Sequence, residues 1–160
     1  TKGLRKKQVL VRYSGGNPTN YTLGQMRFQE SDFSLEILNT SRQDGQLYEY
    51  SVSKGPEEEV WQIQLKVYEP VSDPSIQILS RESANGSCSV SLRCTAERGD
   101  DVSYSWGSRD SAPGLCSGNS SFLNLSYPVP WDGSTPCVCT ARNPVSSRAV
   151  TLEPSQCSPE

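Results

Sequence analysis

The most constraining feature of this sequence is the spacing of two cysteines around a tryptophan, Cys94, Trp106 and Cys139. Short runs of β-branched and aromatic residues surround them, and apolar and polar side chains alternate, as in Val102, Tyr104 and Trp106. Such alternation predicts strands with one face toward a core and the other toward solvent. No stretch carries apolar residues at helical spacing, so we expect few helices. This part of the chain is therefore predicted to be all-β.

Turn residues bound similar short runs throughout the chain. Many short strands between turns are typical of a β-sandwich, and the Cys–Trp–Cys spacing matches the B-strand cysteine, C-strand tryptophan and F-strand cysteine of an immunoglobulin domain. The predicted strands are residues 8–13, 26–29, 32–38, 46–52 and 61–68, then 75–79, 88–95, 101–106, 122–127, 137–142 and 148–152.

The first half shows the same architecture without a cysteine. Its segment from Asp44 to Tyr50 matches the immunoglobulin pattern D-x-G-x-Y-x-C, with Tyr48 at the tyrosine-corner position and Tyr50 in place of the cysteine. Arg27 is expected to pair with Asp44. An unrelated β-meander is the alternative. Nothing before residue 8 supplies strands A and B. A sandwich without strand B would expose its core, so we expect the native domain to have N-terminal strands that this segment lacks.

A proline-rich segment, residues 69–74, divides the halves, because proline donates no hydrogen bond to a ladder. We therefore predict an all-β chain of two tandem immunoglobulin-like β-sandwiches. The first is V-type without the B–F disulfide over residues 1–69, and the second is C2-type over residues 70–160.

The cysteines and sequons predict an extracellular location. All six cysteines lie after residue 87, without the CxxC pairs of a zinc site, which favours disulfides over a metal. Five N-glycosylation sequons agree with secretion. They begin at Asn20, Asn39, Asn85, Asn119 and Asn124.

Composition argues against an enzyme and against nucleic acid as a partner. The chain has no histidine, the commonest general base at neutral pH, and no motif for a nucleophile or a phosphate loop. Its net charge of −3 gives no electrostatic attraction for a polyanion such as nucleic acid. We expect no catalytic residue, no metal, no cofactor and no small-molecule substrate. No apolar run is long enough for a membrane helix, so any anchor is expected outside this chain.

Three passages resemble the signalling lymphocyte activation molecule (SLAM) receptor family of the immunoglobulin superfamily. They are residues 65–74, residues 85–94 with 102–106, and residues 139–147 with the terminal Cys157. The strand around residues 59–67 is most similar to the GPI-anchored short member. The resemblance implies pairing of Cys94 with Cys139 and of Cys88 with Cys157. Cys116 and Cys137 depart from the family pattern; we predict that they pair, with an intermolecular bond or a free thiol as alternatives.

The resemblance also implies a binding face on the V-type domain, built from strands G, F, C and C′ (the GFCC′ face). The expected partner is the V domain of a SLAM-family member on an opposing cell, in homophilic or heterophilic contact. A soluble or viral decoy of such receptors remains the alternative. Alternation and the acidic loop 53–59 select the candidate contact residues; they are Leu10, Arg12, Leu47, Glu49, Ser51, Lys54, Glu57, Glu58, Glu59, Gln62 and Gln64.

Two further features of the first half have open roles. The basic cluster at residues 5–7 is either a ligand-contacting patch or a solvated terminus. Trp61 alternates with the inward-facing residues, so it is expected to pack in the core rather than to anchor an interface.

Overall fold

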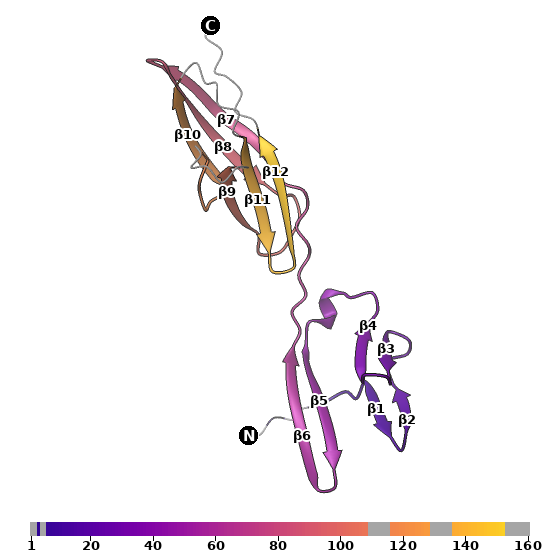
Figure 1. The fold of residues 1–160 in the computed structure, drawn as a ribbon. Helices are drawn as coiled ribbons and strands as arrows, with labels where there is room; N and C mark the ends of the chain where they lie inside the picture. The colour runs from indigo at the N-terminus through magenta and orange to yellow at the C-terminus, as the bar shows by residue number, and fades with distance from the viewer. Residues whose placement is uncertain (1–2, 4–5, 109–115, 129–135, 153–160) are drawn as a thin grey trace. The chain divides into compact units, whose positions relative to one another are not determined.

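The computed structural model describes residues 3, 6–108, 116–128 and 136–152, and its chain divides into two compact units, Thr1–Val67 and Tyr68–Glu160. The described residues are all-β apart from one short 3₁₀ helix, η1 (Arg42–Asp44). The predicted all-β class is confirmed, and Figure 1 shows the strands of each unit.

The second unit is a β-sandwich of two antiparallel three-stranded sheets, ordered β10-β8-β7 and β12-β11-β9. Each sheet contains strands that are distant in sequence, as an immunoglobulin topology requires. The strands are β7 (Ser75–Ala84), β8 (Ser87–Thr95), β9 (Ser103–Ser108), β10 (Phe122–Pro128), β11 (Cys137–Asn143) and β12 (Ser146–Leu152). The predicted runs underlie these strands, with ends that shift by one or two residues except for β7, which extends five residues past its predicted end at residue 79.

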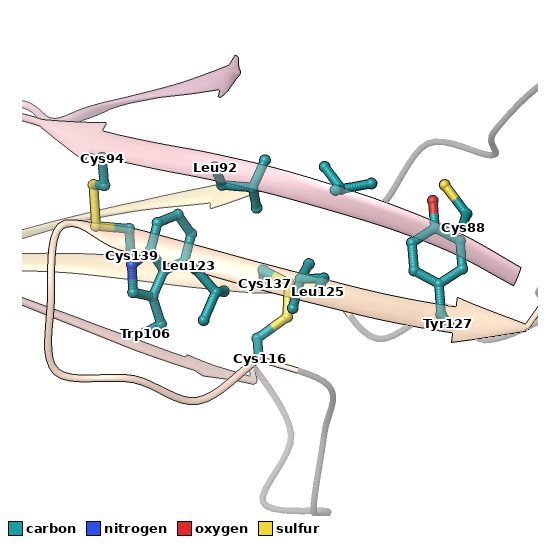
Figure 2. Packing of buried hydrophobic residues seen from close by; sticks show 11 residues of the cluster. Cys88, Leu92, Cys94, Trp106, Cys116, Leu123, Leu125, Tyr127, Cys137 and Cys139 are labelled. Carbon is teal, nitrogen blue, oxygen red and sulfur yellow. A yellow bond between two sulfur atoms is a disulfide. The ribbon is translucent and has the colours of Figure 1, made fainter. Parts of the chain in front are cut away.

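Alternating side chains from the two sheets form the core of this unit (Figure 2). Along β8 every second residue is buried, ending with Leu92 and Cys94. The Cys94–Cys139 disulfide joins β8 of one sheet to β11 of the other, with 6.5 Å between the Cα atoms. Trp106 lies opposite Cys139 in the ladder and is only 5% exposed. Its indole N–H donates to the Ser120 carbonyl at 2.9 Å, so the one polar atom of this buried ring is satisfied.

A second disulfide joins Cys116, which follows β9, to Cys137 at the start of β11, with 5.5 Å between the Cα atoms. Both cysteines belong to the buried cluster. Cys88 is also disulfide-bonded, and its predicted partner Cys157 lies outside the described residues.

The first unit consists of three antiparallel two-stranded sheets: β1-β2, β3-β4 and β5-β6. Strand β2 was missed by the sequence analysis, because Pro18 and three polar residues compose it. Two glycines with positive φ, Gly15 and Gly16, make the tight turn that pairs it with β1. The strands are β1 (Val11–Ser14), β2 (Asn17–Asn20), β3 (Met26–Gln29), β4 (Ser34–Ile37), β5 (Leu47–Lys54) and β6 (Glu57–Gln64).

Two contacts around η1 test the V-type pattern. Tyr48 donates from its hydroxyl to the Asp44 carbonyl at 2.7 Å, which confirms the predicted tyrosine corner. The expected Arg27–Asp44 pair is wrong. Arg27 instead lies 3.8 Å from the carboxylate of Glu36, its direct cross-strand neighbour, and the Asp44 carboxylate accepts from the Ser41 backbone N–H at 2.7 Å.

The apolar side of the β5-β6 sheet is largely exposed. Tyr50 and Trp61 lie opposite each other in the ladder, with ring centroids 5.6 Å apart, and remain 45% and 49% exposed. Ile63 is 60% exposed. The expectation that Trp61 packs in a closed core is therefore wrong for this unit.

Candidate functional site

The candidate site is the β5-β6 hairpin. Sequence analysis assigned residues 53–59 to an acidic loop, and the structure corrects this. The two strands continue to Lys54 and resume at Glu57, so only Gly55 and Pro56 form the turn. Gly55 has φ +60°, as the first central position of a type II′ turn requires. The three glutamates therefore belong to β6, and their side chains alternate between its two sides.

Antiparallel register decides which candidate residues share a side of this sheet, because directly opposed residues point the same way. Glu49 lies opposite Gln62, and Leu47 lies opposite Gln64. We call the side with these residues the polar face. Its members are Leu47, Glu49, Ser51, Ser53, Glu58, Val60, Gln62 and Gln64.

The remaining candidates lie on the other side. Lys54 is opposed to Glu57, and Glu59 is opposed to Val52; both pairs are in phase with the aromatic pair Tyr50–Trp61. The expectation that all three glutamates share one face is therefore wrong. Of the three, Glu58 alone joins the polar face.

The segment before β1 meets the polar face through an ion pair. The Lys7 ammonium lies 2.6 Å from the Glu49 carboxylate, although the two residues are 42 positions apart. The pKa of the Glu49 carboxyl group is lowered, chiefly because Lys7 donates a hydrogen bond to it. Desolvation raises this pKa, but the positive charge of Lys7 and the amide of Gln62 lower it further, and the lowering effects prevail. Lys7 and Glu49 thus form a charge-assisted pair between distant segments of chain, and Gln62 lies opposite Glu49 in the ladder.

Lys7 was noticed in the sequence only as part of a basic cluster, since no local signal reveals a partner so far along the chain. Arg5 lies outside the described residues. The candidates from the C-strand region lie differently: Leu10 is half-buried before β1, and its carbonyl accepts from the Tyr21 N–H at 2.8 Å. Arg12 is exposed and lies opposite Thr19 in the β1-β2 ladder.

All five sequon asparagines are exposed, and the β5-β6 hairpin holds none of them. Asn20 ends β2, where its amide donates to the Met26 carbonyl and its side-chain oxygen accepts from Thr22. Asn124 accepts from the Ser91 hydroxyl at 2.8 Å. The others are Asn39, Asn85 and Asn119, of which Asn39 and Asn85 have positive φ.

In the described part of the chain, no group of three or more metal-binding side chains is clustered. The same residues include no helix that is long and apolar enough to cross a membrane.

Relatives among known proteins decide the family, although no family model matches the chain. The chain is 34% identical to signaling lymphocytic activation molecule of Canis lupus familiaris over 98% of its own length and 46% of that protein. It is 35% identical to the Mus musculus protein of that name, over 97% of this chain and 46% of that one. This chain belongs to the SLAM family. SLAM-family proteins are cell-surface receptors rather than enzymes, and the chain is an extracellular part of such a receptor.

Other matches stay within this family without resolving a subtype. Human T-lymphocyte surface antigen Ly-9 is 31% identical over 79% of this SLAM-family chain and 20% of its own length. The chain spans less than half the length of the SLAM proteins that it matches.

A solved structure supports the fold of this SLAM-family chain. The CD2-binding domain of CD58 (lymphocyte function-associated antigen 3) matches with a TM-score of 0.58, covering 94% of this chain and 80% of the CD58 chain. At 20% sequence identity this match establishes the immunoglobulin-like fold alone.

Proposed function

We propose that this chain is the recognition part of a SLAM-family adhesion and co-signalling receptor, and that it binds the V domain of a family member on an opposing cell. The contact surface is the polar face of β5-β6 together with Lys7. The observation that carries this proposal is the Lys7–Glu49 ion pair, which joins the segment before β1 to a polar face that also carries the charged Glu58.

The distribution of sequons supports the same surface. N-linked glycans are bulky and hydrated, and they obstruct protein contacts around their attachment points. The sequons of the first unit lie at Asn20 and Asn39, outside β5 and β6. The hairpin would therefore remain open to a protein partner in a glycosylated receptor.

The chemistry of the surface predicts a weak, fast contact. Both strands are exposed along their whole length apart from half-buried Tyr48. Charged and polar surfaces of this kind set partner choice and association rate more than tight affinity. Adhesion would then depend on many receptor copies in one cell contact. The CD58 neighbour is itself a CD2-binding domain.

Surface plasmon resonance tests this proposal. The glycosylated chain is passed over immobilised copies of itself and of SLAM-family ectodomains, with E49K as the test variant and E82K on β7 of the second unit as the charge-matched control. We expect binding to at least one V domain, a loss of about tenfold or more in E49K, and no change in E82K.

A charge-swapped double variant, K7E with E49K, separates recognition from stability. It restores the internal ion pair but reverses the charges that a partner meets. We expect it to fold normally and to bind as poorly as E49K. If E49K bound with wild-type affinity, the proposed contact face would be wrong. If the chain bound none of the immobilised ectodomains, the proposed partner would be wrong.

A further inference from the structure

Residues 69–72, at the start of the proline-rich segment that divides the two halves, bond to the second unit. Glu69 and Val71 donate their backbone N–H groups to the Asp100 carboxylate and the Ser146 hydroxyl, both at 2.8 Å. Ser72 donates its N–H to the Arg98 carbonyl at 3.0 Å. Pro70 has no N–H. Every backbone donor from Glu69 to Ser72 is therefore satisfied by the second unit.

Asn143 lies at the centre of these contacts and is 8% exposed. Its amide nitrogen donates to the Glu69 carbonyl at 2.7 Å and to the Asp100 carbonyl at 3.0 Å. Its side-chain oxygen accepts from the backbone N–H groups of Val145 and Ser146 at 3.2 and 2.9 Å. One buried amide thus uses both ends, the nitrogen for the linker and the oxygen for the β11-β12 turn.

The local sequence explains why the amide can do both. Asn143 and Ser146 close a two-residue turn that contains Pro144, and an asparagine before proline commonly accepts from the N–H groups that follow it. The Asn143 oxygen also accepts from the Ser146 hydroxyl at 2.8 Å, which orients that hydroxyl oxygen toward the Val71 N–H.

Packing holds the same segment. Val71 is 4% exposed, and its Cα lies 3.0 Å from the position that a β-carbon on Gly99 would take. Position 99 favours glycine for two reasons: its φ of +133° is rarely adopted by other residues, and Val71 approaches too closely for a β-carbon. On the other side, the Leu65 N–H donates to the Gln46 carbonyl of the first unit at 3.0 Å, and the Val67 Cγ2 atom lies 3.7 Å from the position that a β-carbon on Gly45 would take.

We propose that Asn143 is a positioning residue that clamps Glu69–Ser72 onto the C2-like unit and thereby confines the joint between the two units to the stretch between Val67 and Glu69, centred on Tyr68. A joint of this length changes direction about few backbone dihedrals, whereas a free linker from Val67 to Pro74 would allow wide reorientation.

The test is amide hydrogen exchange by NMR on the full chain, because exchange reports local opening. N143D is the discriminating variant. It keeps the acceptor for Val145 and Ser146, but it loses the donor to Glu69 and Asp100 and faces their carbonyls with a carboxylate. We expect exchange at Glu69 and Val71 to accelerate by about tenfold or more, with unchanged exchange at Val145, Ser146 and the β8 core.

A second pair of variants keeps the test decisive if N143D does not fold. S146A removes the acceptor for the Val71 N–H, and S147A is its exposed neighbour on β12. We expect faster exchange at Val71 in S146A alone. The proposed clamp would be overturned if the Glu69 and Val71 amides of the wild type exchanged without protection. It would also be overturned if their exchange rates were unchanged in N143D and S146A.

Nitrogen-15 relaxation locates the joint. Rigid-backbone order parameters, about 0.85, are expected from β7 back to Glu69, with a decrease at Tyr68. In N143D the decrease should extend toward Pro74. Order parameters that are already low across residues 69–73 in the wild type would contradict a joint confined to this stretch. So would rigid order parameters at Tyr68.

Discussion

The hydroxyl of Tyr48 donates to the backbone carbonyl of Asp44, four residues earlier, and so fastens the start of β5 to η1. This bond lies at the base of the hairpin that carries the polar face. Burial, and then the negative charge of Asp44, raise the pKa of the Tyr48 phenol.

Replacing Tyr48 with phenylalanine should lower the free energy of unfolding by about 1 kcal/mol, the usual net value of one hydrogen bond. Because the folded-state pKa is raised, the contribution of Tyr48 is complete below the ordinary tyrosine pKa and is lost as pH rises above it. Urea denaturation at neutral pH and above pH ~10 measures both effects. Equal stability of the two proteins at neutral pH would contradict a stabilising corner.

Replacing Lys7 with alanine should raise the pKa of Glu49 toward its ordinary value of 4.5. The lowered pKa in the folded wild type means that the contribution of this pair is present above the ordinary glutamate pKa and disappears as pH falls through the folded-state value. A carbon-13 NMR titration of the Glu49 carboxyl group in both proteins measures the shift. K6A is the matched control, and an equal shift in that variant would indicate a general charge effect.

Removing the Cys94–Cys139 disulfide by a double alanine substitution should cost about 2–5 kcal/mol of unfolding free energy. Removing Cys116–Cys137 in the same way should cost less, because it closes a loop of 21 residues rather than 45. Loop entropy alone predicts a difference of about 0.7 kcal/mol. Denaturant unfolding of the two double variants makes the comparison, and a larger loss without Cys116–Cys137 would show that its core packing outweighs loop length.

Replacing Trp106 with phenylalanine keeps a buried ring beside the disulfide but removes the bond to the Ser120 carbonyl and part of the packed volume. We expect a loss of about 1–3 kcal/mol, from the unpaired carbonyl and the cavity together. Thermal unfolding followed by circular dichroism gives the value. W61F, at an exposed position, is the control and should change stability by less than about 0.5 kcal/mol.

The candidate site was predictable only in part. Alternation correctly placed Glu49 and Gln62 on one side of the sheet, because period-two patterning is local. The same alternation, followed through residues 53–59, would have separated Glu58 from Glu57 and Glu59. The separation of the three glutamates was not predicted because the length of the turn was unknown. A Gly-Pro pair is compatible with either a long loop or a two-residue type II′ turn.

The sequence by itself determined the all-β class, the sandwich of the second unit and the tyrosine corner, because each depends on alternation, turn residues or a short fixed spacing. Tertiary structure alone decided that Lys7 pairs with Glu49 and that Asn143, 74 positions from Glu69, holds the linker. These contacts depend on strand register and on which loops meet at the end of a sandwich. A long-range bond made by a polar side chain leaves no local pattern in the sequence, because that side chain is equally compatible with solvent until the fold brings its partner within reach.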